Sequence, residues 1–137
     1  MQKVILDTNV VVSALIQKSF PYLIVYNLYI ERKIQLCLSE ELMTEYYEVL
    51  KRDKFSRFPD FTAMANLVLK DIHEHALFFK PEHKLQIIKD IDDNMLLELA
   101  EASEADYLVT GNTNDFTMSS FLKTRIVSPR EFWRISG

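Results

Sequence analysis

Val4-Ile5-Leu6-Asp7-Thr8-Asn9-Val10 is the stretch of sequence that decides the predicted fold. Its apolar start predicts a buried strand, and the polar Asp-Thr-Asn that follows is typical of the turn from a strand into a helix cap. Four more short apolar runs follow, at residues 35–38, 76–79, 107–110 and 125–127. Helical patterns lie between most of them, as in the crossover units of parallel sheets. The sequence therefore predicts an α/β fold, a three-layer α/β/α sandwich with a central parallel sheet.

The helices are predicted from apolar residues that recur with helical spacing. One helix is expected over residues 20–32, one from the cap Ser39 to about Arg52, and one after Pro59. Two more are expected from Asp92 or Asp93 onward and from Ser128, while residues 80–91 have no regular pattern. The stripes expected to be buried are Tyr22, Val25, Tyr26, Tyr29 and Ile30 in the first helix, and Met64, Leu67, Val68 and Ile72 in the third.

Length and composition restrict the class of protein. The 137 residues carry a formal net charge of −4 and a single cysteine, Cys37. We expect one domain over residues 1–137, in a reducing, cytoplasmic compartment, without a disulfide framework or a cysteine-rich zinc site. No apolar run reaches the roughly 20 residues of a membrane-spanning helix, and the first residues do not resemble a secretory signal, so no membrane association is expected. The mild acidity argues against nucleic-acid binding by bulk charge, but not against an acidic site that recruits a cation.

Acidic and amide side chains cluster near the ends of the predicted strands. Asp7 follows the first strand, Asn112 and Asp115 follow the strand at residues 107–110, and Asp93 begins a helix. Glu45 lies one to two turns into the helix after the second strand, beside its apolar stripe. In an open parallel sheet, the loops after the strands meet at one edge, so these side chains are expected to face one crevice.

A divalent cation is the direct remedy for several carboxylates that share a crevice, because it favours their ionised forms. Oxygen donors without a histidine or cysteine cluster indicate Mg²⁺ or Mn²⁺ as the cofactor. Each residue also has a purely structural interpretation: Asp7-Thr8-Asn9 as a capped turn, Asp93 as a helix-start residue, and Glu45 as the margin of a broad stripe. Their convergence on one edge favours the metal site.

Four segments in this order and spacing resemble a PIN domain over nearly the whole chain. They are residues 4–10, 39–46, 90–94 and 107–112. The branch that the chain most resembles contains VapC-type ribonucleases, the toxins of bacterial toxin–antitoxin systems. The resemblance implies an α/β/α sandwich and a Mg²⁺- or Mn²⁺-dependent endoribonuclease that cleaves by attack of an external water.

The resemblance also implies roles for individual residues. Asp7, Glu45 and Asp93 correspond to the catalytic, metal-binding acids. The family often has a fourth acid where this chain has Asn112, and Asp115, three residues later, is the replacement we expect. Asn9 is expected to orient the acids through hydrogen bonds, with Thr8 as a second supporting residue.

RNA and protein partners are suggested by two further patterns. Lys51, Arg52, Lys54 and Arg57 form the densest basic run and alternate with Phe55 and Phe58, so they are candidates to bind phosphates and stack on a base. A solvated helix end with anchoring aromatic residues is the alternative interpretation. The aromatic stripe in residues 20–29 is a candidate surface for a homodimer or for a cognate antitoxin.

Two other functions compete with the nuclease. A Mg²⁺-dependent phosphatase or phosphoacceptor domain also places an aspartate after its first strand, but Asn9 stands where the phosphatase pattern needs a second aspartate. A catalytically weak or inactive module that binds RNA or protein would retain the fold and lose activity through Asn112.

Overall fold

The structure, a computed structural model, describes residues 1–137 and contains a six-stranded sheet in the order β3-β2-β1-β4-β6-β5. The strands are β1 (Gln2–Leu6), β2 (Ile34–Leu38), β3 (Leu77–Phe78), β4 (Tyr107–Val109), β5 (Ser120–Phe121) and β6 (Thr124–Val127). All neighbouring pairs are parallel except β5 and β6, which are antiparallel. The parallel sheet is confirmed, and the sequence missed only the two-residue edge strand β5.

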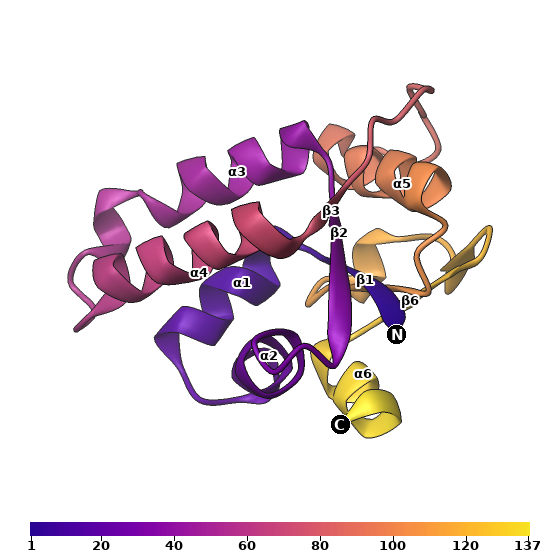
Figure 1. The fold of residues 1–137 in the computed structure, drawn as a ribbon. Helices are drawn as coiled ribbons and strands as arrows, with labels where there is room; N and C mark the ends of the chain where they lie inside the picture. Colours follow the sequence, from indigo (N-terminus) through magenta and orange to yellow (C-terminus); the bar gives the residue numbers. More distant parts are fainter.

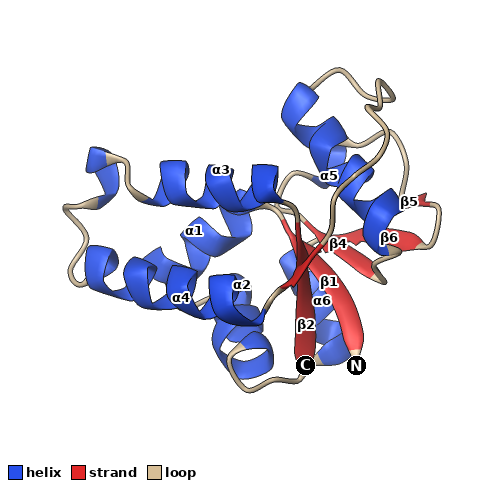
Figure 2. Cartoon of the chain, turned by 45° about the horizontal axis from the view of Figure 1, so that its top comes forward, coloured by secondary structure: helices blue, strands red, loops and turns tan.

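Helices lie on both sides of this sheet (Figures 1 and 2). The helices α1 (Thr8–Ile16), α3 (Glu40–Leu50) and α4 (Phe61–His75) gather on one side, with α2 (Phe20–Leu23) below them in Figure 1. Helix α5 (Ile91–Ser103) lies on the other side, and α6 (Pro129–Ser136) ends the chain. The predicted α/β/α sandwich is therefore confirmed.

Local side-chain caps mark the starts of three helices, α3, α5 and α6. The Ser39 hydroxyl accepts the backbone N–H of Leu42 and caps α3. At α6, Ser128 and Glu131 form a reciprocal capping box. Helix α5 is capped by Asp90, whose carboxylate accepts the N–H groups of Asp92 and Asp93. The helix therefore begins at Ile91, one or two residues before the start expected at Asp92 or Asp93, and both aspartates lie in its first turn.

Residues 20–32 do not form a single α-helix. After α2, Ile24–Tyr29 form a π-helix, labelled η1, in which the N–H of Ile30 donates to the carbonyl of Val25 at 2.9 Å. The wider turn changes the buried face. The buried residues of this segment are Ile24, Val25, Leu28 and Tyr29, while Tyr22, Tyr26 and Ile30 are only partly covered.

Helix α4 buries a different stripe from the predicted one. Val68 and Ile72 are buried as expected, but Leu67 is 62% exposed and Met64 is only partly covered. The buried face instead contains Phe61, Ala65 and Leu69. The apolar periodicity predicts the helix, but packing against the neighbouring elements determines which of its faces is buried.

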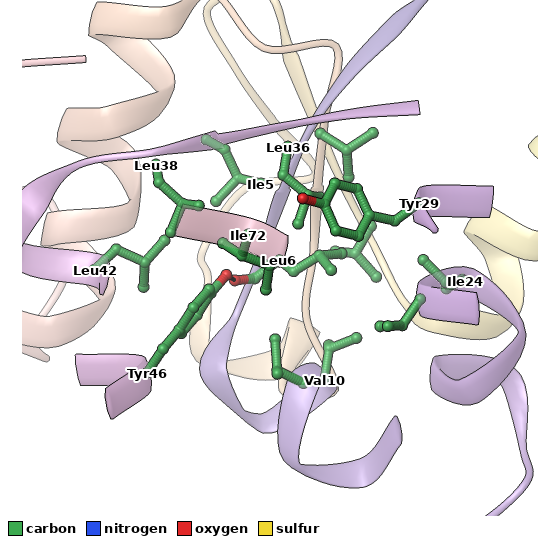
Figure 3. Close-up of a cluster of buried hydrophobic side chains, with 14 of the residues drawn as sticks. Ile5, Leu6, Val10, Ile24, Tyr29, Leu36, Leu38, Leu42, Tyr46 and Ile72 are labelled. Atoms are coloured by element: carbon green, nitrogen blue, oxygen red, sulfur yellow. Dashed lines mark hydrogen bonds between the residues drawn. The ribbon is translucent and has the colours of Figure 1, made fainter. Parts of the chain in front are cut away.

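The core covers both faces of the sheet, with buried residues of α1, α3 and α4 on one side and of α5 on the other. Figure 3 shows aliphatic residues of β1 and β2 packed against α1, α3 and α4, with Tyr46 and Tyr29 at the margins of the cluster.

Cys37 is buried in β2, and burial raises the pKa of its thiol to about 11. No single helix is long and apolar enough to cross a membrane, and only the pair Thr8–Ile16 and Phe20–Tyr29, bent by 97°, passes that test together.

Candidate active site

One pocket at the carboxyl edge of the sheet collects the acidic residues. It is lined by six carboxylates, those of Asp7, Glu45, Asp90, Asp92, Asp93 and Asp115. The other lining residues are Thr8, Asn9, Val49, Arg52, Leu96 and Asn112. Its volume of about 210 Å³ is below the range of pockets that enclose a drug-sized ligand. The pocket therefore suits an ion and one small group of a larger substrate.

The pairing of β1 with β4 positions Asp7. Leu6 pairs with Val109, so the residues that follow these strands, Asp7 and Thr110, are also level. The N–H of Asp7 donates to the Val109 carbonyl at 3.0 Å, and the Thr110 hydroxyl donates to the Asp7 carboxylate at 2.8 Å. Asp7 is only 8% exposed, so this bond satisfies one of its oxygens where water has little access.

Helix α3 carries Glu45 to the same pocket. The Thr8 hydroxyl donates a short hydrogen bond to the Glu45 carboxylate. The next residue, Tyr46, is fully buried and donates its phenolic O–H to the Leu6 carbonyl. Tyr46 therefore fixes α3 against the end of β1, which sets Glu45 opposite Asp7.

The first turn of α5 carries Asp93, and the chain before it is anchored by Asn94. The Asn94 carboxamide accepts the N–H groups of Ile87 and Ile88, both at 3.0 Å, and donates to the carbonyls of Ile88 at 2.6 Å and Asp90 at 3.1 Å. Asn94 is buried and uses its full hydrogen-bonding capacity. It connects the irregular segment before α5 to the helix and so supports the position of Asp93.

The segment after β4 brings Asp115 and Asn112 to the pocket. Asp115 ends a short 3-10 turn, η3 (Thr113–Asp115), and its charge raises the pKa values of Asp7 and Asp93. The N–H of Asn112 donates to the Thr110 hydroxyl, the same group that holds Asp7. Both side chains are exposed, so this part of the pocket faces solvent.

Burial and mutual repulsion raise the pKa values of three carboxyl groups in the pocket. Desolvation is the largest cause for Asp7, Glu45 and Asp93 alike, and neighbouring carboxylates add to it at each. The pKa of Asp93 is raised to about 6, with Asp90 as the strongest charged neighbour. The ionised pocket is therefore unfavourable by itself and attracts positive charge.

Without a divalent cation, Asp93→Asn is expected to be more stable than the wild type at pH 7. Asp93 keeps its proton to about pH 6 in the folded state but releases it near 3.8 in the unfolded chain. The folded state thus binds more protons across that window, and wild-type stability falls as the pH rises through it. Because Asp93 is half-buried and screened by solvent, the gain is about 1 kcal/mol, well below the full shift.

Urea unfolding in EDTA at pH 4 and pH 7 measures this difference. The advantage of the variant should be much smaller at pH 4, where folded Asp93 keeps its proton and the unfolded chain, with a pKa near 3.8, is close to half protonated. An equal advantage at both pH values would show that it does not come from this carboxyl group. Asp60→Asn, at an exposed residue outside the pocket, is the matched control.

The donor set fits a hard divalent cation by its chemistry. The candidate ligands are the carboxylate oxygens of six acidic side chains, and no histidine or cysteine lines the pocket. No three of these side chains converge into ligating geometry as they stand. Asp7, Glu45 and Asp93 could hold such an ion, and its charge would offset the burial and repulsion that raise their pKa values.

Asn9 has only part of the role expected of it, because it acts on Asp7 through a backbone hydrogen bond, which lowers the pKa of Asp7 against the larger effect of burial. It lines the pocket, but its side chain makes no hydrogen bond to an acid. Thr8 and Thr110 make those bonds instead. The sequence predicts Thr8 as a supporting residue but indicates Thr110 only as the end of a strand.

The four basic residues of the run at 51–57 separate in space. Arg52 lines the acidic pocket, while Lys51, Lys54 and Arg57 lie over the rings of Tyr47, Phe55 and Phe58. Phe55 is buried and stacks on Phe61, so it is not available to stack on a base. The expected base contact at Phe55 is therefore wrong, because that ring belongs to the core.

Several residues that shape the site were not identified from the sequence. Thr110, Tyr46 and Asn94 act through bonds to distant or irregular backbone, which leave no periodic pattern. Asp90 and Asp92 were visible as part of the acidic run at 90–93, and that run was the available signal that the pocket holds more than one acid from this segment.

Comparison with known proteins agrees with this arrangement. The model of a family described as the PIN domain matches residues 3–114, which include all the residues that line the pocket except Asp115. A search of curated proteins returned no match.

Proposed function

The chain belongs to the PIN domain family, a family of nucleases that generally depend on a divalent metal, and from this premise we propose that it is a Mg²⁺- or Mn²⁺-dependent endoribonuclease. The observation that carries the proposal is the single pocket in which six carboxylates from distant segments meet. A phosphatase or phosphoacceptor has no support from the family match.

The residues of the site divide into acids that would bind the metal and neutral residues that hold those acids in place. We assign Asp7, Glu45 and Asp93 to the ion, with Asp115 as the further carboxylate in place of Asn112. The bound ion would supply a water of lowered pKa and offset the charge that develops on the phosphoryl oxygens. Thr110 holds Asp7 and Thr8 holds Glu45, so the ligands keep their orientation before the substrate arrives.

Hydrolysis by an external water requires no nucleophile from the protein. No cysteine lines the pocket, and its one lining hydroxyl group, that of Thr8, already donates to the Glu45 carboxylate. The expected products have 5′-phosphate and 3′-hydroxyl ends, because the 2′-hydroxyl takes no part. RNA, rather than DNA, is proposed from the resemblance of the motifs to VapC-type ribonucleases.

We further propose that the protein acts as the toxin of a toxin–antitoxin pair. The resemblance supports this role. A cognate antitoxin or a second copy of the chain would find apolar groups at the α1–α2 corner, where Ile16 and Phe20 are each more than a third exposed. Within the aromatic stripe at residues 20–29, Tyr29 is buried in the core and Tyr26 packs against it, so fewer aromatic side chains are available to a partner than the sequence predicts.

Cleavage of a panel of labelled RNAs tests the nuclease directly. Purified protein is incubated with Mg²⁺, with Mn²⁺ or with EDTA, beside Asp93→Asn and the surface variant Asp60→Asn. We expect metal-dependent cutting by the wild type and by Asp60→Asn, and none by Asp93→Asn. If the folded wild type cuts no RNA under any of these conditions, the inactive binding module, which Asn112 favours, becomes the better description.

A further inference from the structure

Arg52 is the one cation among the residues that line the acidic pocket. It follows Glu45 and Val49 at helical spacings of seven and three residues, and all three residues line the pocket. Helix α3 ends at Leu50, and the extended backbone of Arg52 (φ −65°, ψ 135°) turns the chain away from the helix there. The end of the helix therefore delivers a guanidinium to the margin of the site.

The guanidinium of Arg52 is not engaged elsewhere in the protein. It forms no ion pair and no side-chain hydrogen bond, although six carboxylates line the same pocket. Its three basic neighbours in the sequence each lie over an aromatic ring, but Arg52 does not. Its positive charge nevertheless acts on the site, since it lowers the pKa of Glu45 against the larger effect of burial.

An anionic substrate needs positive charge at this position. A phosphodiester carries a negative charge and would be repelled by carboxylates that a cation has only partly neutralised. An exposed arginine at the rim, free of internal partners, offers a planar fork of donors that matches two phosphate oxygens.

We propose that Arg52 binds the phosphate that is cleaved, and that Lys51, Lys54 and Arg57 bind RNA only outside the cleavage pocket. This inference rests on the proposed nuclease function. As water adds to phosphorus, negative charge accumulates on the non-bridging oxygens, so a guanidinium bound there interacts more strongly with the transition state than with the bound substrate. Arg52 therefore affects turnover, whereas its basic neighbours affect affinity.

Single-turnover cleavage at saturating RNA separates these two effects. Arg52→Ala is expected to lower the rate on the order of 10²-fold, and Arg52→Lys on the order of tenfold, because lysine keeps the charge but not the fork. Lys54→Ala should raise the RNA concentration needed for half-saturation and leave the saturated rate within about threefold. Arg134→Ala is the matched control, since Arg134 is exposed on α6 and does not line the pocket.

A binding measurement supports the assignment without turnover. In an Asp93→Asn background, adding Arg52→Ala should weaken binding of a short RNA by several-fold, while adding Arg134→Ala should not. Circular dichroism confirms that each variant is folded, as expected for an exposed side chain without internal partners.

The outcomes distinguish this inference from the proposed function. If the wild type cuts RNA and Arg52→Ala matches Arg134→Ala, the assignment of Arg52 is overturned and the nuclease stands. If Arg52→Ala weakens binding but leaves the saturated rate unchanged, Arg52 contacts RNA away from the reacting phosphate, which also overturns the assignment. If the wild type cuts no RNA, the proposed function and this inference both fail.

Discussion

Asp7→Asn is expected to lower metal-dependent RNA cleavage at least about a thousandfold while leaving the fold intact. Asp7 is the most buried of the pocket's acids and is assigned to the ion. Loss of its charge weakens the electrostatic stabilisation of the transition state by several kcal/mol, which corresponds to about three orders of magnitude in rate.

The same substitution should not destabilise the metal-free protein. The carboxamide oxygen of asparagine still accepts the Thr110 hydroxyl, and the neutral group avoids the desolvation that raises the pKa of Asp7. Cleavage rates and thermal unfolding in EDTA are the two measurements, with Asp60→Asn as the control. An inactive variant that melts below the wild type would mean that Asp7 is primarily a structural residue.

Asn94→Ala is expected to have the largest effect on stability, a loss of about 2–3 kcal/mol. The substitution removes the only side-chain partner of two N–H groups and two carbonyls in residues 87–90. The better helix propensity of alanine offsets only a few tenths of a kcal/mol of this cost. Urea unfolding at pH 7 measures the change.

Cleavage by Asn94→Ala should also fall, by about tenfold, because Asp93 lies next to the anchor and loses its support. Asn66→Ala is the matched control, since Asn66 is an exposed residue of α4 and should be neutral or slightly stabilising. A loss below about 0.5 kcal/mol would show that water replaces the Asn94 bonds without cost.

The opposing effects expected at Asp7 and Asn94 reflect two ways of holding an acid in place. Asp7 and Asp93 are themselves unfavourable charges in the metal-free protein, and their removal relieves repulsion. The groups that hold them, Thr110 and Asn94, are neutral and hydrogen-bonded, and their removal leaves partners unpaired. Functional sites typically combine acids whose charges are unfavourable for stability with neutral neighbours whose hydrogen bonds stabilise the fold.

The sequence by itself determined the parallel sheet and which edge of it carries the acids. Most of the strands are short apolar runs followed by a polar residue, and the starts of α3 and α6 have local caps at Ser39 and Ser128. These signals act between residues a few positions apart, so they can be recognised without the fold. Because the carboxyl ends of parallel strands share one edge, the approach of Asp7, Glu45, Asp93 and Asp115 followed from them.

Only the tertiary structure decided which neutral residues hold those acids and which basic side chain lies beside them in the pocket. Thr110 bonds to a residue 103 positions away, and Tyr46 to one 40 positions away, so neither partner can be read from local pattern. Four basic residues between 51 and 57 look alike in the sequence, yet the end of α3 brings only Arg52 to the pocket. The faces of η1 and α4 were likewise set by packing, because helical periodicity fixes the spacing of a stripe but not the neighbour against which it turns.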